Sequence, residues 1–363
     1  MYDLVIIGGG PAGATLARLA AAWGQVLLLE KRPAPADPDS PDWRKTCGGL
    51  IAPAALKALA DMKLAVPPDV TARPQSMLVR AVDLDGRRER CYRRRYLNVH
   101  RGRLDRWLLS LVPPSVEVQY GARLRAVEPR GDAVTVYYRW GKAAVSVEAR
   151  VAAAADGAAS RVRRIILPGR PAPRIYVAIQ EWLADVQSPP QANGAPCYTA
   201  IFDRAVTDFY AWTIPKDDLL IVGAAMPAEG RADSRFRLLR SRLAERLGID
   251  GQVRQRERTI LLRPARVGHV RAGRGRVLLL GEAAGLISPS SGEGLGFAFR
   301  SAMAAAGALR ADAHNPLPGY QRRLLPLKAA VGMKLLKSAA IFTPPVRSLL
   351  MLSGLGAAPD AEA

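Results

Sequence analysis

The residues whose types and spacing best suit chemistry lie near the start of the chain, in a glycine-rich run. Residues 8–13 read Gly-Gly-Gly-Pro-Ala-Gly and fit the pattern G-x-G-x-x-G, which binds the phosphates of dinucleotides. Gly8 permits a tight turn, Gly10 lets the backbone approach a pyrophosphate, and Gly13 lets a helix pack closely on a strand. Ala12 belongs to the same predicted binding loop. Free N–H groups at the start of that helix would bind phosphate oxygens.

An acidic residue follows this run at the distance that dinucleotide binding requires. Glu30 lies twenty-two residues after Gly8 and ends an apolar stretch. Its carboxylate can accept hydrogen bonds from the hydroxyls of an adenosine ribose. We place Lys31, the next residue, in the same predicted cofactor site.

Three short elements must hold these residues in place. Residues 5–7 predict a buried strand, residues 14–23 are rich in Ala and Leu and predict a helix, and residues 26–30 predict a second strand. A glycine pattern alone is weak evidence, because glycines cluster in ordinary turns. Here the elements and the acid follow the order of a βαβ unit, so dinucleotide binding is favoured over a plain structural turn.

A second glycine-rich loop follows a strand late in the chain. Residues 276–280 predict the strand, residues 281–294 form the loop, and residues 295–311 predict a long Ala-rich helix. N–H groups at such a helix start can bind anionic oxygens. In the middle of the chain, Asp156-Gly157 ends another predicted strand, and on its own this pair signals only a turn.

The segment after the βαβ unit contains a cysteine followed by two glycines, Cys47, Gly48 and Gly49. This sequence suggests backbone that passes close to a flat ligand, and a loop with a buried cysteine is the competing interpretation. A helix follows at residues 100–111, in which Arg101 and Asp105 have the i,i+4 spacing of an ion pair.

The pattern changes in the second half of the chain. Residues 174–266 predict longer strands with aromatic residues and a second domain, in which Pro215 marks the end of a strand. Residues 233–247 predict a basic amphipathic helix. The tail, residues 316–356, predicts two helices broken at residues 343–345.

Length and composition limit the class of protein. The 363 residues suffice for two or three domains, and 49% hydrophobic residues indicate a globular chain. The three cysteines are widely spaced, so neither a disulfide framework nor a zinc site is expected, and we predict no metal. No apolar run reaches the roughly 18–20 residues of a membrane span. With no visible secretory signal, we expect a cytoplasmic protein.

The net charge of +21 favours anionic partners. No helix-turn-helix, zinc-finger or RRM signature accompanies the basic residues, so specific nucleic-acid binding is not expected. An arginine-rich solvated surface is the simplest interpretation. Lys328, Lys334 and Lys337 alternate with apolar residues in the tail, which suggests peripheral contact with an anionic membrane at its inner face. A helix packed on its own domain explains the tail equally well.

Three motifs in this order resemble the FAD-dependent oxidoreductases of the para-hydroxybenzoate-hydroxylase type. They are G-x-G-x-x-G at the start, A-D-G-x-x-S at residues 155–160 and G-E-x-x-G-L-x-x-P-x-x-G-E-G at residues 281–294. The resemblance implies FAD as cofactor and an α/β fold: a Rossmann-like FAD-binding domain, a mixed-sheet substrate domain and a helical C-terminal segment.

The resemblance also implies cofactor-binding residues beyond the first loop. Arg101 would contact the cofactor, and Asp156 and Gly157 would lie beside it. Gly281 and Glu282 would lie at the ribityl and pyrophosphate part, although Glu282 stands where the family usually has Asp. The remaining residues would face the isoalloxazine ring, and these are Pro289, Gly292 and Gly294.

By the same resemblance, the chain divides into six segments. The FAD-binding domain would comprise residues 1–73, 98–173 and 269–312, the substrate domain residues 74–97 and 174–268, and the helical segment residues 313–363.

Within this group the chain is most similar to the geranylgeranyl reductase family. The supporting residues are Cys47-Gly48-Gly49, the box Tyr210-x-Trp212-x-Ile214-Pro215, and the helical tail. The family's box is Y-x-W-x-F-P, whereas flavin-dependent halogenases carry W-x-W-x-I-P, so the present box lies between the two. A halogenase or monooxygenase acting through a flavin peroxide is therefore the alternative, and a flavoprotein that serves as a sensor or structural partner is a third class.

The reductase resemblance implies hydride transfer from FADH2 to a carbon–carbon double bond of a prenyl or other hydrophobic lipid. Such an alkene also needs a proton, an apolar tunnel and exclusion of water. Cys47 is the candidate for a role near the flavin, because a free thiol is mostly protonated at neutral pH. Tyr210 and Trp212 would line the tunnel. NADPH or another electron carrier would supply the electrons. Chain length, head group and oligomeric state remain open at this point.

Overall fold

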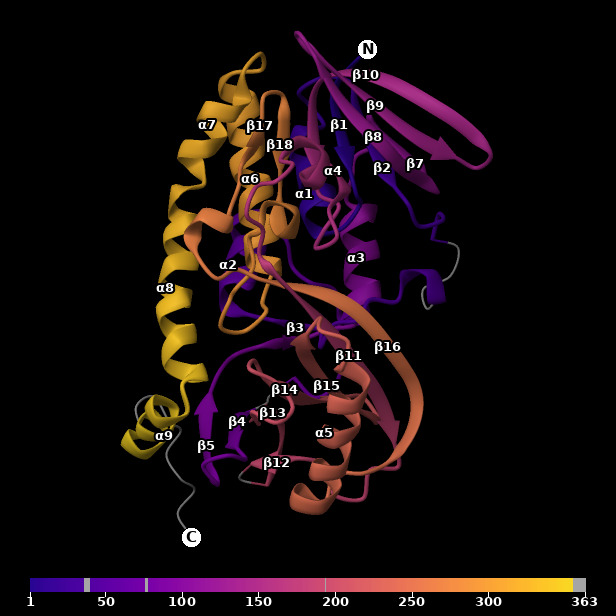
Figure 1. The fold of residues 1–363 in the computed structure, drawn as a ribbon. Coiled ribbons are helices and arrows are strands. Elements are labelled where there is room, and N and C mark those ends of the chain that lie inside the picture. Colours follow the sequence, from indigo (N-terminus) through magenta and orange to yellow (C-terminus); the bar gives the residue numbers. More distant parts are fainter. Residues whose placement is uncertain (36–39, 76–77, 193, 355–363) are drawn as a thin grey trace.

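Two sheets carry the fold and lie at opposite ends of the molecule in Figure 1. The computed structural model describes residues 1–35, 40–75, 78–192 and 194–354. The first sheet lies near the N-terminus. The second lies beside α5 (Ala232–Leu247), and the long strand β16 (Gln252–Arg263) forms its edge.

The centre of the first sheet is parallel, as a βαβ unit requires. β1 (Tyr2–Ile7) pairs in parallel with β2 (Val26–Glu30) and with β10 (Ala143–Ala154). Every residue of β2 is buried, which fits a strand covered on both faces. The other strands are β7 (Val116–Tyr120), β8 (Ala122–Arg130), β9 (Ala133–Trp140), β17 (Gly273–Arg274) and β18 (Val277–Leu279).

Helices α1 (Pro11–Ala20) and α6 (Leu295–Ala311) pack together beside this sheet. α1 begins three residues earlier than predicted, because Pro11 suits the first turn, where its missing N–H is not needed. α6 has the predicted bounds. The other helices associated with this half are α2 (Pro53–Asp61), α3 (Arg101–Ser110), α4 (Arg161–Ile166) and α7 (Pro316–Arg323).

The second sheet is assembled from separated parts of the chain. β4 (Leu78–Asp83) and β5 (Arg88–Arg93) join strands that follow about a hundred residues later, and β4 pairs in parallel with β13 (Ala195–Phe202). α5 packs against β11 (Arg174–Ala184) and β15 (Leu219–Pro227). The remaining strands are β12 (Gln191–Ala192) and β14 (Ala211–Lys216).

A short strand pair lies where the chain crosses between the two sheets. It consists of β3 (Leu50–Ile51) and β6 (Leu97–Asn98). Short 3₁₀ turns complete the structure at Pro41–Trp43, Pro68–Val70, Val267–His269 and Gly281–Ala284.

The C-terminal segment forms three helices where two were predicted. α7 ends at Arg323 and α8 (Leu325–Phe342) begins almost at once. Pro326 explains this additional break, because a proline is tolerated only in the first turn of a helix. The predicted break at residues 343–345 separates α8 from α9 (Pro344–Ser353). Residues 355–363 of the predicted tail lie outside the described residues.

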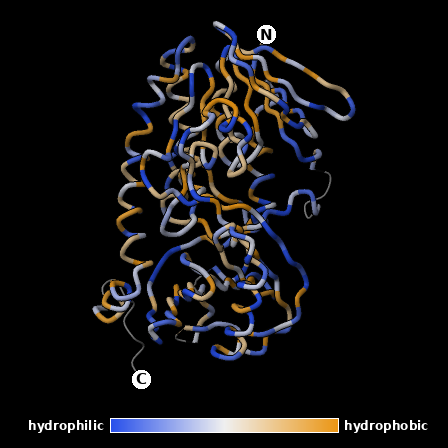
Figure 2. Tube along the Cα trace, in the orientation of Figure 1, coloured by the Kyte–Doolittle hydropathy of each residue, from blue (hydrophilic) through white to orange (hydrophobic). Residues whose placement is uncertain are grey.

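α8 runs along one side of the molecule, from the first sheet toward the second (Figure 1). Figure 2 shows apolar residues on the central strands of the first sheet and again on α8 and α9. Among the described residues, no helix combines the length and apolar character that crossing a bilayer requires.

Candidate cofactor and substrate site

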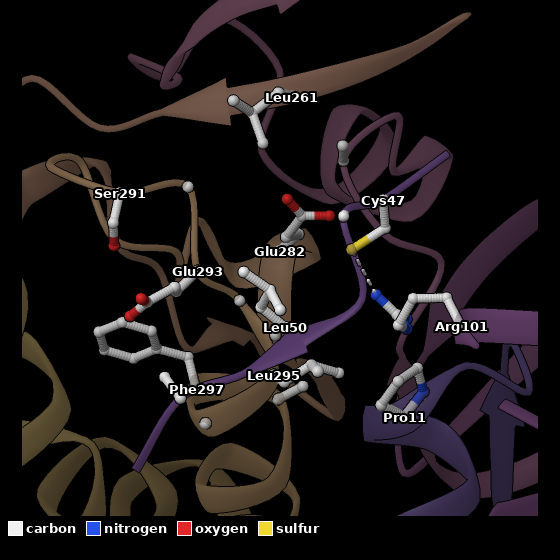
Figure 3. Close-up of a pocket in the computed structure, with 18 of the residues that line it drawn as sticks. Pro11, Cys47, Leu50, Arg101, Leu261, Glu282, Ser291, Glu293, Leu295 and Phe297 are labelled. Atoms are coloured by element: carbon white, nitrogen blue, oxygen red, sulfur yellow. Dashed lines mark hydrogen bonds between the residues drawn. The ribbon is translucent and has the colours of Figure 1, made fainter. Parts of the chain in front are cut away.

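One large cavity of about 1800 Å³ lies between the two sheets, and Figure 3 shows part of it. Residues from distant parts of the chain line it together. The sequence-predicted site residues among them are Gly8, Gly10, Ala12, Glu30, Lys31, Cys47, Gly48, Gly49, Arg101, Asp156, Gly157, Tyr210, Trp212, Gly281, Glu282, Gly292 and Gly294.

Two predicted residues do not line this cavity, Gly13 and Pro289. Gly13 lies behind the loop, where its expected role was in packing. Pro289 differs from expectation: it is buried, and its carbonyl accepts hydrogen bonds from Arg263 and Ser338, both at 3.2 Å. These bonds connect Pro289 to β16 and to α8.

The glycines of the first loop have the geometry that their spacing predicts. A Cβ atom at Gly13 would lie 1.8 Å from the carbonyl oxygen of Gly8, so helix and strand are in direct backbone contact. Gly8 has a φ of +103°, which favours glycine. At Gly10 a Cβ atom would meet no atom within 4 Å. The loop therefore leaves its backbone accessible at Gly10, where the pyrophosphate is expected.

No side chain caps the first turn of α1, whose N-cap is Gly10. The N-terminal end of this helix thus borders the cavity with its positive dipole end unopposed by a capping side chain. Together with the open backbone at Gly10, this end provides the cradle that a dinucleotide phosphate needs. The residues present fit the ADP part of FAD.

Glu30 is nearly fully buried, and its carboxylate is held on two sides. Oε2 accepts hydrogen bonds from the backbone N–H of Gly9 at 2.8 Å and from Nη2 of Arg32 at 3.1 Å. Arg32 also lies over the ring of Trp43, with 3.9 Å between Cζ and the ring centroid. The sequence interpretation did not include Arg32, although its position two residues after the predicted acid was an available signal.

This ion pair continues toward the cysteine. Nη1 of Arg32 lies 3.5 Å from Asp105, whose other carboxylate oxygen accepts a hydrogen bond from Arg101 at 2.9 Å. Nη1 of Arg101 in turn donates to Sγ of Cys47 at 3.2 Å (Figure 3). Burial alone would raise the pKa of Asp105, but the two arginines outweigh it and hold that pKa below its usual value. An alternating series of charges therefore connects Glu30 to Cys47.

The loop that carries Cys47 is fixed by close backbone contacts. A Cβ atom at Gly48 would lie 2.3 Å from Cδ1 of Ile214, and one at Gly49 would lie 2.1 Å from the carbonyl oxygen of Val99. Gly49 also has a φ of +70°. The two glycines let this loop pass between Val99 and Ile214, which sets the position of the thiol.

Lys216 lies beneath this loop and is almost fully buried. Its Nζ donates to Oδ1 of Asn98 and to the carbonyl oxygen of Val99, the latter at 2.9 Å. Burial lowers the pKa of Lys216 to about 8, while Cys47 and Asp217 partly oppose this shift. Lys216, the last residue of β14, thus bonds to β6 and to the residue that follows it.

The aromatic box joins the second sheet to the late glycine loop. Tyr210 donates a hydrogen bond from its hydroxyl to the carbonyl oxygen of Ser291 at 2.7 Å. The Trp212 ring lies on Gly223 of β15, where a Cβ atom would come within 2.4 Å of Cε2. Burial raises the pKa of the Tyr210 hydroxyl well above its usual value. Tyr210 and Trp212 form part of the cavity wall.

In the late loop, Glu282 and Glu293 both line the cavity (Figure 3). Burial raises the pKa of Glu282, and Lys45 and Arg101 partly oppose this effect. Glu293 accepts a hydrogen bond from the hydroxyl of Tyr96 at 3.0 Å. Asp156, from the middle motif, accepts hydrogen bonds from the first N–H groups of α4, at 2.8 and 3.2 Å.

Several cavity residues escaped the sequence interpretation. They come from strands or connections in which neither motif nor spacing marked them, and they include Tyr96, Gln180, Tyr198 and Phe202. Among the described residues, no group of three or more His, Cys, Asp and Glu side chains is arranged to hold a metal ion.

Comparisons with known proteins agree with this geometry. A family model described as FAD binding domain matches residues 1–314. The chain is 35% identical over 361 residues to the protein CbrA of Escherichia coli O6:H1. The aligned region covers 99% of this chain and 96% of that relative.

Two solved structures share the fold. A geranylgeranyl bacteriochlorophyll reductase-like protein from Thermoplasma acidophilum matches with a TM-score of 0.73 and 19% identity, over 96% of this chain and 98% of that one. The flavin-dependent brominase Bmp2 matches with a TM-score of 0.72 and 18% identity, over 97% and 92%. At these identities the likeness establishes the fold alone.

The expected fold class and the expected cofactor are thereby confirmed. The family match spans the βαβ unit, the middle motif and the late glycine loop, which are the three parts that meet at the cavity. This chain belongs to the FAD-binding-domain family of flavoproteins, and its cofactor is FAD.

Proposed function

We propose that this flavoprotein reduces carbon–carbon double bonds of a prenyl lipid. The observation that carries the proposal is that a cysteine thiol and a broad apolar wall line the same cavity as the predicted cofactor residues. The apolar wall comes from the second sheet and from α8 and α9, and it comprises Val79, Ala81, Ala200, Phe202, Trp212, Ile214, Leu261, Ile341 and Leu350. A long hydrocarbon chain fits such a surface better than a small polar substrate does.

When bound and reduced, FAD supplies the hydride. The residues of the chain must then hold the alkene, exclude water and deliver a proton to the second carbon. Arg101 donates to Sγ of Cys47, which uses one lone pair of the sulfur and does not engage the S–H hydrogen. Tyr210 already donates its proton to the Ser291 carbonyl. Cys47 is therefore the better proton donor, and Tyr210 and Trp212 orient the hydrocarbon.

The electron donor in this proposal is NADPH or another reduced carrier. Membership of the FAD-binding family supports an oxidoreductase, and the similarity of residues 47–49 and of the Tyr210 box to geranylgeranyl reductases supports the narrower reaction.

Stopped-flow absorbance of the flavin tests the proposal. We expect a polyprenyl compound to reoxidise the anaerobically reduced protein, and mass spectrometry to find two added hydrogens for each bond reduced. If prenyl compounds leave the reduced flavin unchanged, and oxygen with chloride or bromide instead gives a halogenated product, the protein is a halogenase and the proposal is wrong.

A further inference from the structure

The outer face of α8 and α9 exposes an unusual number of large apolar side chains. We name this face the α8–α9 surface and define it by the exposed residues Leu325, Met333, Leu336, Val346, Leu349 and Leu352. Met333, Leu336 and Leu349 are 68%, 69% and 66% exposed. Leu325, Met333 and Leu336 follow helical spacing, so they form one stripe along α8.

This exposure does not result from loose packing of the two helices. Arg347 of α9 forms a two-pronged ion pair with the buried Asp83 of β4, with both N–O distances at 2.8 Å. On α8, Ser338 is buried and bonds to Pro289 and Arg263. Buried polar contacts thus fix the inner side of both helices, and the apolar stripe is left largely exposed on the outer side.

The charged residues that α7, α8 and α9 themselves contribute are all basic. Residues 316–353 contain no Asp or Glu, and their six basic residues are Arg322, Arg323, Lys328, Lys334, Lys337 and Arg347. Lys334 and Lys337 line the cavity, as does Arg94, which directly follows β5. Burial and then the nearby Arg94 and Lys334 lower the pKa of Lys337, while Glu293 partly opposes this shift. A nearby anion would relieve this crowding of like charges.

We propose that the α8–α9 surface docks on an anionic phospholipid bilayer. The apolar stripe would enter the boundary between head groups and acyl chains. The basic residues would contact lipid phosphates, except for Arg347, which is buried in its ion pair with Asp83. Ala340, Ile341 and Leu350 of the same two helices line the cavity. Docking in this orientation brings the cavity rim to the lipid surface, so a hydrophobic substrate enters without crossing water.

Sedimentation with vesicles tests this surface, and it does not depend on the proposed reaction. The FAD-loaded protein is mixed with phosphatidylcholine vesicles that contain or lack phosphatidylglycerol. We expect binding only to the anionic vesicles, and weaker binding as salt rises. Leu336→Glu and Leu349→Glu should each reduce binding about tenfold or more, since each removes one buried leucine from the lipid contact.

Val253→Glu is the matched control. Val253 is 47% exposed on β16, on the other side of the molecule from α8 in Figure 1, and its substitution should leave binding unchanged. The flavin absorbance of each variant verifies that it is folded. Three results overturn the proposal: binding to neither vesicle, equal loss in all three variants, or a dimer in lipid-free solution that Leu336→Glu dissociates. The last result would assign the surface to a second copy of the chain.

Discussion

Gly48 lies directly against Ile214, so the cysteine loop and the aromatic box are in contact through a position with no room for a side chain. A Cβ atom at residue 48 would lie 2.3 Å from Cδ1 of Ile214. Ile214 is the residue in which the present box differs from that of the geranylgeranyl reductases. The same residue covers the backbone next to Cys47.

This contact predicts a compensating pair of substitutions. Gly48→Ala should destabilise the protein by about 1–3 kcal/mol through overpacking. Ile214→Val removes the atom that clashes, so the double variant should be more stable than the sum of the two single effects predicts. Urea unfolding of the four proteins measures this coupling. If the changes in unfolding free energy of the two single variants simply add, the loop must move away from β14 without loss of stability.

The first loop separates packing from cofactor contact. Gly13→Val should prevent FAD binding and lower the stability of the FAD-free protein, because its side chain would strike the Gly8 carbonyl. Gly10→Ala should weaken FAD binding without lowering that stability, since its Cβ atom has open space. Flavin absorbance and thermal unfolding measure the two effects. Gly268→Ala, also in open space but outside the cavity lining, is the control. Full FAD occupancy in Gly13→Val would refute this account of the loop.

Cys47→Ala should slow flavin reoxidation by a prenyl substrate while FAD stays bound. Loss of a positioned proton donor typically costs about 10²- to 10⁴-fold in rate. Single-turnover stopped-flow measurements give that rate directly. Cys91→Ala is the matched control, because Cys91 does not line the cavity. An unchanged rate in Cys47→Ala would require another proton donor.

Lys216 predicts a pH dependence of stability. Its pKa is about 8 in the folded protein and 10.5 in the unfolded chain, so the unfolded chain binds more protons between these values. The free energy of unfolding should therefore rise with pH across this window, by at most about 3 kcal/mol. Urea unfolding of the wild type and Lys216→Met, at several pH values from 8 to 10.5, tests this. If the free energies of unfolding of the two proteins change with pH in parallel, the lowered pKa of Lys216 is contradicted.

The ion pair between Asp83 and Arg347 anchors α9. Both side chains are buried, so Arg347→Met leaves an unpaired carboxylate and should cost about 3–5 kcal/mol of unfolding free energy. Asp83→Leu combined with Arg347→Met should recover much of this loss, because no buried charge remains. Chemical unfolding compares the variants. A double variant as unstable as Arg347→Met would mean that the two side chains stabilise the protein chiefly by packing and not by their charges.

Local patterns predicted the parts of the fold that local physics determines. The βαβ unit and α6 followed from apolar runs, glycines and helix formers within about thirty residues. The break between α7 and α8 was also local, and Pro326 was its overlooked signal. The motifs additionally identified seventeen residues that share one cavity.

Contacts between distant segments could not be predicted from local sequence patterns. Tyr96 reaches Glu293 across almost two hundred residues, and Arg347 reaches Asp83 across more than two hundred and fifty. A single charged or aromatic residue carries no sign of which distant partner it meets. Pro289 shows the opposite case: its place in a motif predicted a cavity position, but the packing of α8 determined its surroundings.

The order of strands in the first sheet has a consequence for synthesis on the ribosome. β1 is among the first residues made, yet its neighbour β10 ends at Ala154, and β18 pairs with β10 only from Val277 onward. α6, which packs on α1, is complete only at Ala311. The nascent chain therefore carries its phosphate loop without a finished binding site until most of its length has emerged. We therefore expect capture of the cofactor only after α6 has emerged, and we expect a truncated chain that ends before α6 to lack flavin.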